Sequence, residues 1–202
     1  MKAVVVYESM YGNTHLIADA IAEGLREHGE VVVVPVHQAD TALIDSADLV
    51  VVGGPTHAHG MSRTETRRMA AEAADKPGAT VERDADAEGD GLREWFDTIG
   101  DLDKDAAAFD TRFAFAAALT GRASKGIARQ LHHRRARLLC APESFLVTRD
   151  NHLEPDEQAR AREWGYRLGY EIDGRGVEIG IYPPAAPWPR HDTQPTHLWP
   201  EK

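Results

Sequence analysis

Three short, valine-rich apolar runs constrain the fold of this chain more than any other feature of its sequence. They cover residues 3–7, 31–36 and 50–52, and almost no polar residue interrupts them. A strand with one face in water alternates between apolar and polar residues, whereas a strand buried on both faces is apolar throughout. These runs therefore predict strands in the centre of a sheet that is covered on both sides.

Segments with helical periodicity separate the apolar runs. In residues 16–25, apolar residues recur at the three- and four-residue spacing that places them on one helix face. Further helices are predicted for residues 92–99, 124–133 and 155–172, and further strands for residues 112–119 and, with a break near Pro142, 137–147. Five buried strands alternating with helices predict a doubly wound α/β fold with a parallel sheet. We expect one domain over residues 1–172.

The charge of the chain is distributed unevenly. Its 33 acidic and 23 basic residues give a net charge of −10, which argues against a dedicated nucleic-acid binder. Residues 72–90 contain seven acidic but only two basic residues and a single large aliphatic side chain. We predict a solvated, mobile insertion that does not touch a ligand, with a binding element as the alternative. Residues 173–202 hold six of the eleven prolines and are predicted to form a proline-rich tail.

The sequence contains few signs of a disulfide, a metal site or a membrane span. Its one cysteine, Cys140, lies in a predicted apolar strand, where an inert core thiol is expected. His57 and His59 form a His-x-His pair, but no acidic or cysteine partner follows at ligand spacing, so no metal site is predicted. The apolar runs are too short to span a bilayer, and no signal peptide is recognised, so a cytoplasmic location is expected.

The loop after the first predicted strand has the character of an anion site. It consists of Ser9, Met10, Tyr11, Gly12, Asn13 and Thr14 and leads into a helix N-terminus. Free backbone amides and the helix dipole attract an anion there, and the glycine permits a tight turn. Without a lysine or GxGxxG spacing, the loop matches neither a Walker A nor a dinucleotide motif. A phosphate monoester held by neutral donors and an ordinary capped turn both remain open.

Two loops resemble those of a known family. Residues 7–14, YESMYGNT, follow the first predicted strand and resemble the phosphate loop of flavodoxin-like proteins. The likeness is strongest to the tryptophan-repressor-binding-protein type of NAD(P)H:quinone oxidoreductases, in which a Ser-Met-Tyr-Gly stretch cradles the phosphate of FMN. Residues 54–62, GPTHAHGMS, follow the third predicted strand and resemble the loop that lines the flavin ring in that family.

This resemblance implies a flavodoxin-like fold with strand order 2-1-3-4-5 and FMN as the cofactor. The phosphate would bind through residues 9–14. The residues implied at the ring are Pro55, Thr56, His57, Ala58, His59 and Gly60, together with Thr120, Gly121 and Arg122 from the loop after the fourth predicted strand. That last loop contains no aromatic residue, although shuttle flavodoxins sandwich the ring between aromatic side chains. We assign no chemical role to residues 109–112.

The implied chemistry is a redox reaction. His57 and His59 are the catalytic candidates, because histidine titrates near neutral pH and can protonate a reduced quinone. Arg122 and Lys125 would stabilise negative charge on a reduced ring and favour a reductase, although a solvated basic loop is an equally good interpretation. The basic stretch that continues to Arg137 could attract an NADPH phosphate or an acidic partner, or be a solvated helix face.

Two versions of the predicted function therefore stand side by side. One is electron transfer to a partner protein, and the other is NAD(P)H-dependent quinone reduction. A flavin-free binding or regulatory module on the same scaffold is the alternative. The oligomeric state, the electron donor and the electron acceptor are left open by the sequence.

Overall fold

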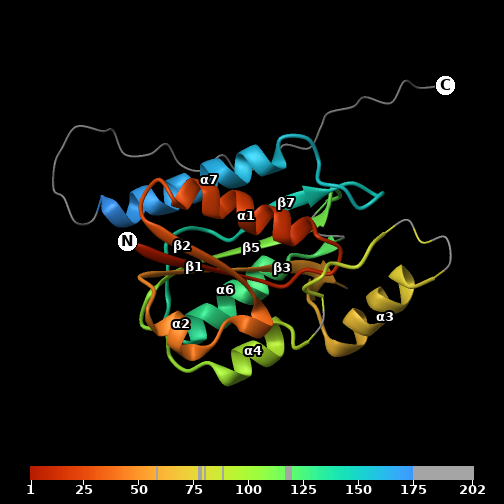
Figure 1. The fold of residues 1–202 in the computed structure, drawn as a ribbon, viewed down its shortest axis with the longest axis horizontal. Coiled ribbons are helices and arrows are strands. Elements are labelled where there is room, and N and C mark those ends of the chain that lie inside the picture. Colours follow the sequence, from red (N-terminus) through yellow and green to blue (C-terminus); the bar gives the residue numbers. More distant parts are fainter. Residues whose placement is uncertain (58, 77–78, 80, 88, 117–119, 175–202) are drawn as a thin grey trace.

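Buried parallel strands form the centre of the protein, as the valine-rich runs predict. The computed structural model describes residues 1–174 except 58, 77–78, 80, 88 and 117–119. Strand β1 (Lys2–Tyr7) lies between β2 (Glu30–Pro35) and β3 (Leu49–His57), and β5 (Asp105–Phe113) pairs with the other side of β3. All three pairings are parallel, and the strands of each pair run in register over five to seven residues. Figure 1 shows this sheet from its edge.

The outer edge of the sheet is divided into two short strands. Both β6 (Arg137–Leu138) and β7 (Glu143–Val147) pair with β5 in parallel, one after the other along its length. This gives the path β2-β1-β3-β5-β6, so the predicted order 2-1-3-4-5 and the break near Pro142 are confirmed. A two-residue strand, β4 (Gly60–Met61), turns back antiparallel against the end of β3.

The backbone of β7 is occupied on its outer side as well. The N–H of Leu146 donates to the carboxylate of Glu157 at 3.0 Å, and its carbonyl accepts from the N–H of Glu154 at 2.9 Å. A local bridge between Val147 and Leu153 extends this cover. The last strand of the sheet is therefore capped by the segment that follows it.

Helices cover both faces of the sheet (Figure 1). On one face lie α1 (Asn13–Leu25) and α7 (Glu157–Asp173), and on the other lie α2 (Thr41–Asp45), α4 (Leu92–Thr98) and α6 (Ala123–His133). Two further short elements complete the described part of the chain, the 3₁₀ turn η1 (Val36–Gln38) and α3 (Thr64–Ala74). The three-layer arrangement confirms the doubly wound α/β fold.

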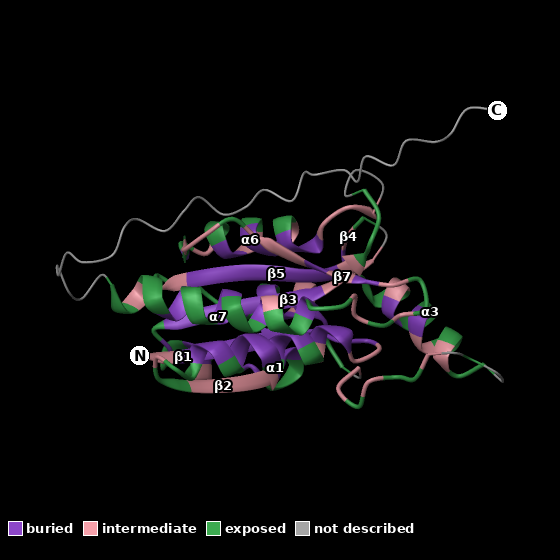
Figure 2. Ribbon diagram, turned by 90° about the horizontal axis from the view of Figure 1, so that it is seen from above, coloured by how far each residue is buried: buried purple, intermediate pink, exposed green. Residues whose placement is uncertain are grey.

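Side chains that alternate along β1 supply the two cores. Val4 and Val6 pack toward α4 and α6, whereas Val5 and Tyr7 pack toward α1 and α7. Strands β1 and β5 are buried over most of their length and β3 over its first six residues, whereas the edge strand β2 is mostly intermediate; Figure 2 shows this contrast between β5 and β2. Because both faces of β1 are covered, none of its central side chains points into water, and this explains its uninterrupted valines.

Close backbone contact joins α1 to α7. A Cβ added to Gly24 would lie 2.0 Å from the carbonyl oxygen of Arg162, and one added to Gly165 would lie 2.1 Å from that of Ile21. Side chains at these positions would force the helices apart, so glycine is required there by the approach itself.

The position of the fourth strand was predicted wrongly. The strand was predicted for residues 112–119, which are more apolar than the residues before them. The observed strand is β5 (Asp105–Phe113). Its centre is the small run Ala106–Ala108, which is buried under large side chains from both helix layers. Residues 114–116 lie beyond the strand, and the side chains of Phe113 and Phe115 are 48% and 42% exposed. Hydrophobicity alone favours residues 112–119 over β5, because the tightly packed sheet centre is occupied by small alanine side chains rather than by large apolar ones.

The acidic segment 72–90 is not separate from the fold. Its first residues belong to α3, and the N–H of Asp84 donates to the carbonyl of Met10 in the predicted phosphate loop at 2.9 Å. Asp84 therefore contacts the predicted phosphate loop, and that the segment does not touch a ligand stays a prediction. That the segment is mobile stays a prediction.

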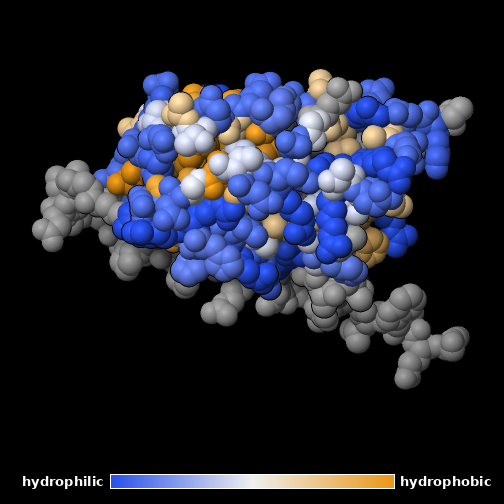
Figure 3. Space-filling model, turned by 90° about the horizontal axis from the view of Figure 1, so that it is seen from below, coloured by the Kyte–Doolittle hydropathy of each residue, from blue (hydrophilic) through white to orange (hydrophobic). Residues whose placement is uncertain are grey.

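The surface is mainly hydrophilic. In the face drawn in Figure 3, charged and polar side chains predominate, with apolar patches between them. Within the described residues, none of the helices combines the length and the apolar character needed to cross a bilayer. The proline-rich tail, with the exception of its first two residues, lies outside the described residues.

Candidate functional site

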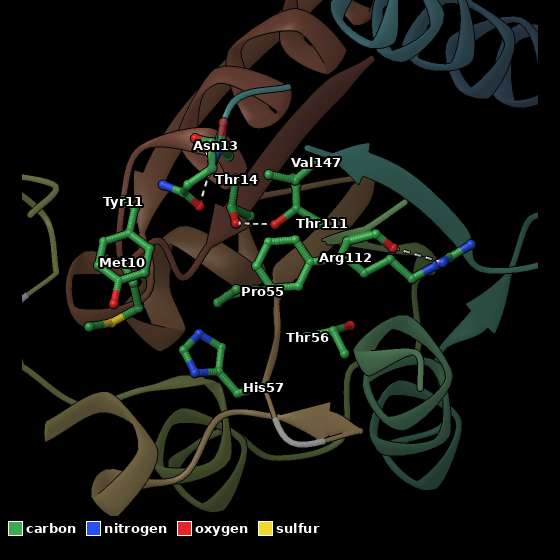
Figure 4. Close-up of a pocket in the computed structure, with 12 residues that line it drawn as sticks. Met10, Tyr11, Asn13, Thr14, Pro55, Thr56, His57, Thr111, Arg112 and Val147 are labelled. Carbon is green, nitrogen blue, oxygen red and sulfur yellow. Dashed lines mark hydrogen bonds between the residues drawn. The ribbon is translucent and has the colours of Figure 1, made fainter. Parts of the chain in front are cut away.

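The carboxyl ends of β1, β3, β5 and β7 surround a cavity of about 270 Å³ (Figure 4). In a doubly wound sheet, this edge is where ligands bind. The lining residues that were predicted from the sequence are Met10, Tyr11, Asn13, Thr14, Pro55, Thr56 and His57. The lining residues that sequence reasoning missed are Thr111, Arg112, Phe113, Val147 and Asn151. The structure thus brings the first two predicted loops together at one site.

The loop between β1 and α1 presents backbone N–H groups. Gly12, which precedes α1, has φ +88°, a left-handed conformation that glycine adopts without strain. Its N–H donates to the hydroxyl of Ser9 at 3.1 Å, which tightens the turn. Among the described residues, the N–H groups of Tyr11, Asn13 and Thr14 have no hydrogen-bond acceptor. Together with the positive end of the helix dipole, these groups are chemically suited to an anion beside the cavity.

The side chains of this loop are fixed by other parts of the chain. The amide of Asn13 donates to the backbone carbonyl of Asn151 at 2.9 Å and to its side-chain oxygen at 3.1 Å. The hydroxyls of Thr14 and Thr111 are 2.8 Å apart in the interior. The amide of Asn13 therefore holds the loop that follows β7, and a contact of Asn13 with a phosphate stays a prediction.

A buried carboxylate positions the second loop. Asp110 in β5 is fully buried, and its Oδ2 accepts from the hydroxyl of Thr56 at 3.0 Å and from the N–H of Ser124 at 2.8 Å. Thr56 in turn accepts from the N–H of Ala123 at 2.8 Å. Burial raises the pKa of Asp110, and the hydrogen bonds it accepts oppose that shift. Asp110 therefore ties β3 to the first turn of α6, a role that the sequence did not suggest.

His57 ends β3 and lines the cavity. Burial lowers its pKa, an effect that the carboxylate of Glu8 partly opposes and the guanidinium of Arg67 reinforces. Its ring is therefore neutral at pH 7. As a neutral imidazole it can donate one hydrogen bond and accept another, but it is a weaker source of protons than an ordinary histidine.

Two neighbouring hollows, outside the first cavity, are lined by four further predicted residues: His59, Gly60, Gly121 and Arg122. A hollow of about 320 Å³ is lined by His57, His59 and Gly60, and a further one of about 720 Å³ by His59, Gly121 and Arg122. His59 is exposed, with φ +72°, and bridges to Gly121. The hydroxyl of Thr120 donates to the carbonyl of Gly121. Ala58 lies outside the described residues.

The largest of the three hollows is basic. Its lining includes the cationic side chains of Arg93, Arg122, Lys125 and Arg129, and no carboxylate is among its described lining residues. Arg122 and Lys125 do not line the first cavity, where they were expected. The cation at that cavity is Arg112, whose Nη1 donates to the carbonyls of Phe113 and Phe115 at 3.2 and 2.7 Å.

Two aromatic side chains line the first cavity, Tyr11 and Phe113. Tyr11 donates from its hydroxyl to the carbonyl of Ala70 at 3.0 Å, which anchors its ring to α3. Phe113 was missed because the fourth strand was placed too late in the chain. The carboxyl-end rule, applied to the correct strand end, would have found it. Nothing in the sequence pattern pointed to Asn151.

Comparison with known proteins identifies the family of this chain. The sequence model of the flavodoxin family matches residues 5–164. The chain belongs to the flavodoxin family. Membership in this family indicates a flavin-binding redox function. Comparison of the sequence with curated proteins gives no match.

Solved structures share the flavodoxin fold with this chain. A flavodoxin from the domain Archaea is 18% identical with a TM-score of 0.57, over 86% of this chain and 99% of its own. A flavodoxin of Streptococcus pneumonia TIGR4 is 18% identical with a TM-score of 0.59, over 85% and 99%. A WrbA-like flavodoxin protein of Agrobacterium tumefaciens is 19% identical with a TM-score of 0.52, over 86% and 98%.

Proposed function

We propose that this protein binds FMN at the first cavity and uses it to reduce quinones with electrons from NAD(P)H. The observation that carries the proposal is the set of open N–H groups at the start of α1, next to a cavity flanked by Tyr11 and Phe113. One end of this site suits an anion and the other suits a planar ring. FMN has both parts in one molecule.

The phosphate end fits a monoester. The N–H groups of Tyr11, Asn13 and Thr14 are free to donate, and no lysine or arginine is part of the loop. Neutral donors at a helix N-terminus stabilise a phosphate without a counter-charge from a side chain. FMN carries a terminal phosphate of this kind, whereas riboflavin carries none, so the loop is expected to distinguish the two.

The ring end fits an apolar, planar group. Pro55 and Val147 supply apolar lining beside the two aromatic rings, and His57 supplies a neutral imidazole. Arg112 adds a positive charge at the same cavity. When bound, FMN supplies the capacity to accept and release electrons. The guanidinium of Arg112 then stabilises the negative charge that reduction adds, a role that was assigned to Arg122 and Lys125 from the sequence.

The basic hollow supports a dinucleotide as electron donor. It adjoins the first cavity through the hollow at His57 and His59, and four cations line it. NAD(P)H carries its negative charge on phosphates at a distance from the nicotinamide that reacts. The hollow can hold these phosphates while the nicotinamide reaches the ring. His59, exposed between the hollows, is the better candidate to deliver a proton to a reduced quinone.

The first experiment is a spectrum of the purified protein and a titration of the apoprotein with FMN. We expect a yellow protein that binds one FMN per chain and binds riboflavin much more weakly. NADPH oxidation with a soluble quinone then tests the reductase. A protein that binds FMN but does not oxidise NADPH is an electron carrier for a partner protein. A colourless protein that ignores FMN is a flavin-free module, and that result overturns the proposal.

A further inference from the structure

His15, Asp84 and Asp86 bring three metal-ligating atoms together beside the phosphate loop. His15 is in the first turn of α1, and the two aspartates belong to the acidic segment 72–90. The Nδ1 of His15 lies 3.6 Å from the Oδ2 of Asp84 and 3.7 Å from the Oδ2 of Asp86. All three atoms lie within 4.8 Å of one another. None of the three residues lines the cavity proposed for FMN.

These separations suit coordination better than hydrogen bonding. A nitrogen and an oxygen joined by a hydrogen bond lie about 2.7–3.2 Å apart. Two ligands that are each about 2.0–2.2 Å from a tetrahedral metal ion lie about 3.3–3.6 Å apart. The distance from His15 to Asp84 is within this second range, and the distance to Asp86, at 3.7 Å, is slightly above it. An ion between them therefore requires only small movements of the side chains.

Asp84 provides an independent sign that something binds here. Its side chain is only 6% exposed, and its Oδ2 is buried without a hydrogen-bond partner among the described residues. A buried carboxylate oxygen without a partner is costly. This oxygen points to the same space as the Nδ1 of His15 and the Oδ2 of Asp86. A cation in that space would supply the missing interaction.

Neighbouring groups hold the three ligands in place. The hydroxyl of Tyr7 donates to the Oδ2 of Asp86 at 2.6 Å, and the N–H of Asp86 donates to the Oδ1 of Asp84 at 3.1 Å. The ring of Tyr7 stacks on that of His15, with centroids 4.5 Å apart and an interplanar angle of 21°. Partners of this kind fix the orientation of metal ligands and are a regular part of metal sites.

We propose that the Nδ1 of His15 and the Oδ2 atoms of Asp84 and Asp86 bind one divalent first-row transition-metal ion. One imidazole and two carboxylates suit Zn²⁺, Mn²⁺ or Co²⁺, whereas Mg²⁺ and Ca²⁺ prefer oxygen alone. His15 and Asp86 are 36% and 26% exposed, which leaves room for water as a further ligand. The ion joins the acidic segment to α1 and also neutralises carboxylates beside the phosphate loop. It does not depend on the proposed flavin chemistry.

The test uses the full chain after treatment with a chelator, with Zn²⁺ alone as the titrant in calorimetry. We expect one strong site per chain, and about tenfold or greater loss of affinity in each of His15→Asn and Asp84→Asn. With Co²⁺, the wild-type protein should show a visible absorption band that both variants lack. Circular dichroism of each variant establishes that it is folded.

Matched controls separate this site from adventitious binding. The chain has other histidines and acids, so His133→Gln on the exposed end of α6 and Glu82→Gln in the acidic segment should bind Zn²⁺ as the wild type does. The double variant His191→Gln/His197→Gln tests the tail in the same way. The proposal is overturned if the wild-type protein binds neither Zn²⁺ nor Co²⁺ strongly. It is also overturned if the His15 and Asp84 variants bind Zn²⁺ as tightly as the wild type does. FMN titration of the same samples reports separately on the proposed function.

Discussion

The hydroxyl oxygens of Thr14 and Thr111 lie 2.8 Å apart in the interior of the protein and join the phosphate loop to β5. Thr14 belongs to the first turn of α1, directly after β1. Thr111 lies near the carboxyl end of β5, which is separated from β1 in the sheet by β3. This hydrogen bond sets the distance between the part of the site that is proposed to hold the phosphate and the part proposed to border the ring.

Replacing Thr111 with valine should destabilise the protein by about 1–3 kcal/mol, because the buried hydroxyl of Thr14 then has no partner. The double variant Thr14→Val/Thr111→Val should be more stable than the sum of the two single variants predicts, since both polar groups are gone. Urea unfolding of all four proteins measures this. Additive effects would show that the two hydroxyls do not interact.

Arg112 should raise the reduction potential of bound FMN. In Arg112→Gln we expect the two-electron midpoint potential to fall by roughly 30 mV, which corresponds to about 1.4 kcal/mol. Arg26→Gln removes the same charge at the far end of α1 and should leave the potential unchanged. Equal midpoint potentials in the wild type and in the Arg112 variant would show that this guanidinium does not act on the flavin ring.

Asp110 should matter for stability because two other groups donate hydrogen bonds to it. In Asp110→Ala, the N–H of Ser124 and the hydroxyl of Thr56 lose a buried acceptor, and the free energy of unfolding should fall by about 2–3 kcal/mol. Asp110→Asn keeps one oxygen and should lose less. Asp97→Asn on the exposed side of α4 serves as the control and should change stability by under about 0.5 kcal/mol.

His57 should make the apoprotein less stable in mild acid. Burial lowers its pKa in the folded state, so the unfolded chain binds more protons below about pH 6.5, and stability decreases as the pH falls. The decrease from one such group is at most about 1.4 kcal/mol per pH unit. In His57→Gln, the difference in unfolding free energy between pH 7.5 and 5.5 should be smaller.

The carboxylate of Glu94 does not titrate in this pH window. Burial opposes ionisation of Glu94, but hydrogen bonds from Arg67 and Thr64 outweigh it and lower the pKa of Glu94 to about 2. Its contribution therefore changes only below about pH 4.5, outside the range measured. His133→Gln, at an exposed histidine, is the matched control. A wild-type protein that loses no more stability than His57→Gln would exclude the effect.

Sequence reasoning located the strand end and the helix start on either side of the predicted phosphate loop because the necessary signals are local. An apolar run, a glycine and a helix stripe follow one another within residues 3–25, so the strand end and the helix start can be placed together. The same reasoning failed at β5. The alanines of its buried centre are weak signals, whereas Phe113 and Phe115 are strong ones, although Phe113 is the last residue of β5 and Phe115 lies beyond the strand.

Contacts between distant segments were beyond the reach of the sequence. Asp84 follows the predicted phosphate loop by seventy positions, and its sequence neighbours are those expected of a solvated residue. That it hydrogen-bonds to Met10 and approaches His15 depends on how α3 returns the chain to the sheet edge. The same is true of Asn151, whose carbonyl accepts from Asn13 across the site.

The cover over β7 has a consequence for association between copies of the protein. A bare edge strand offers a row of free N–H and carbonyl groups with which a second molecule can extend the sheet, and that is a common start of aggregation. Here the N–H and carbonyl of Leu146 are already used by Glu157 and Glu154. At β7, Leu146 therefore offers a second copy of the protein no free backbone group with which to extend the sheet.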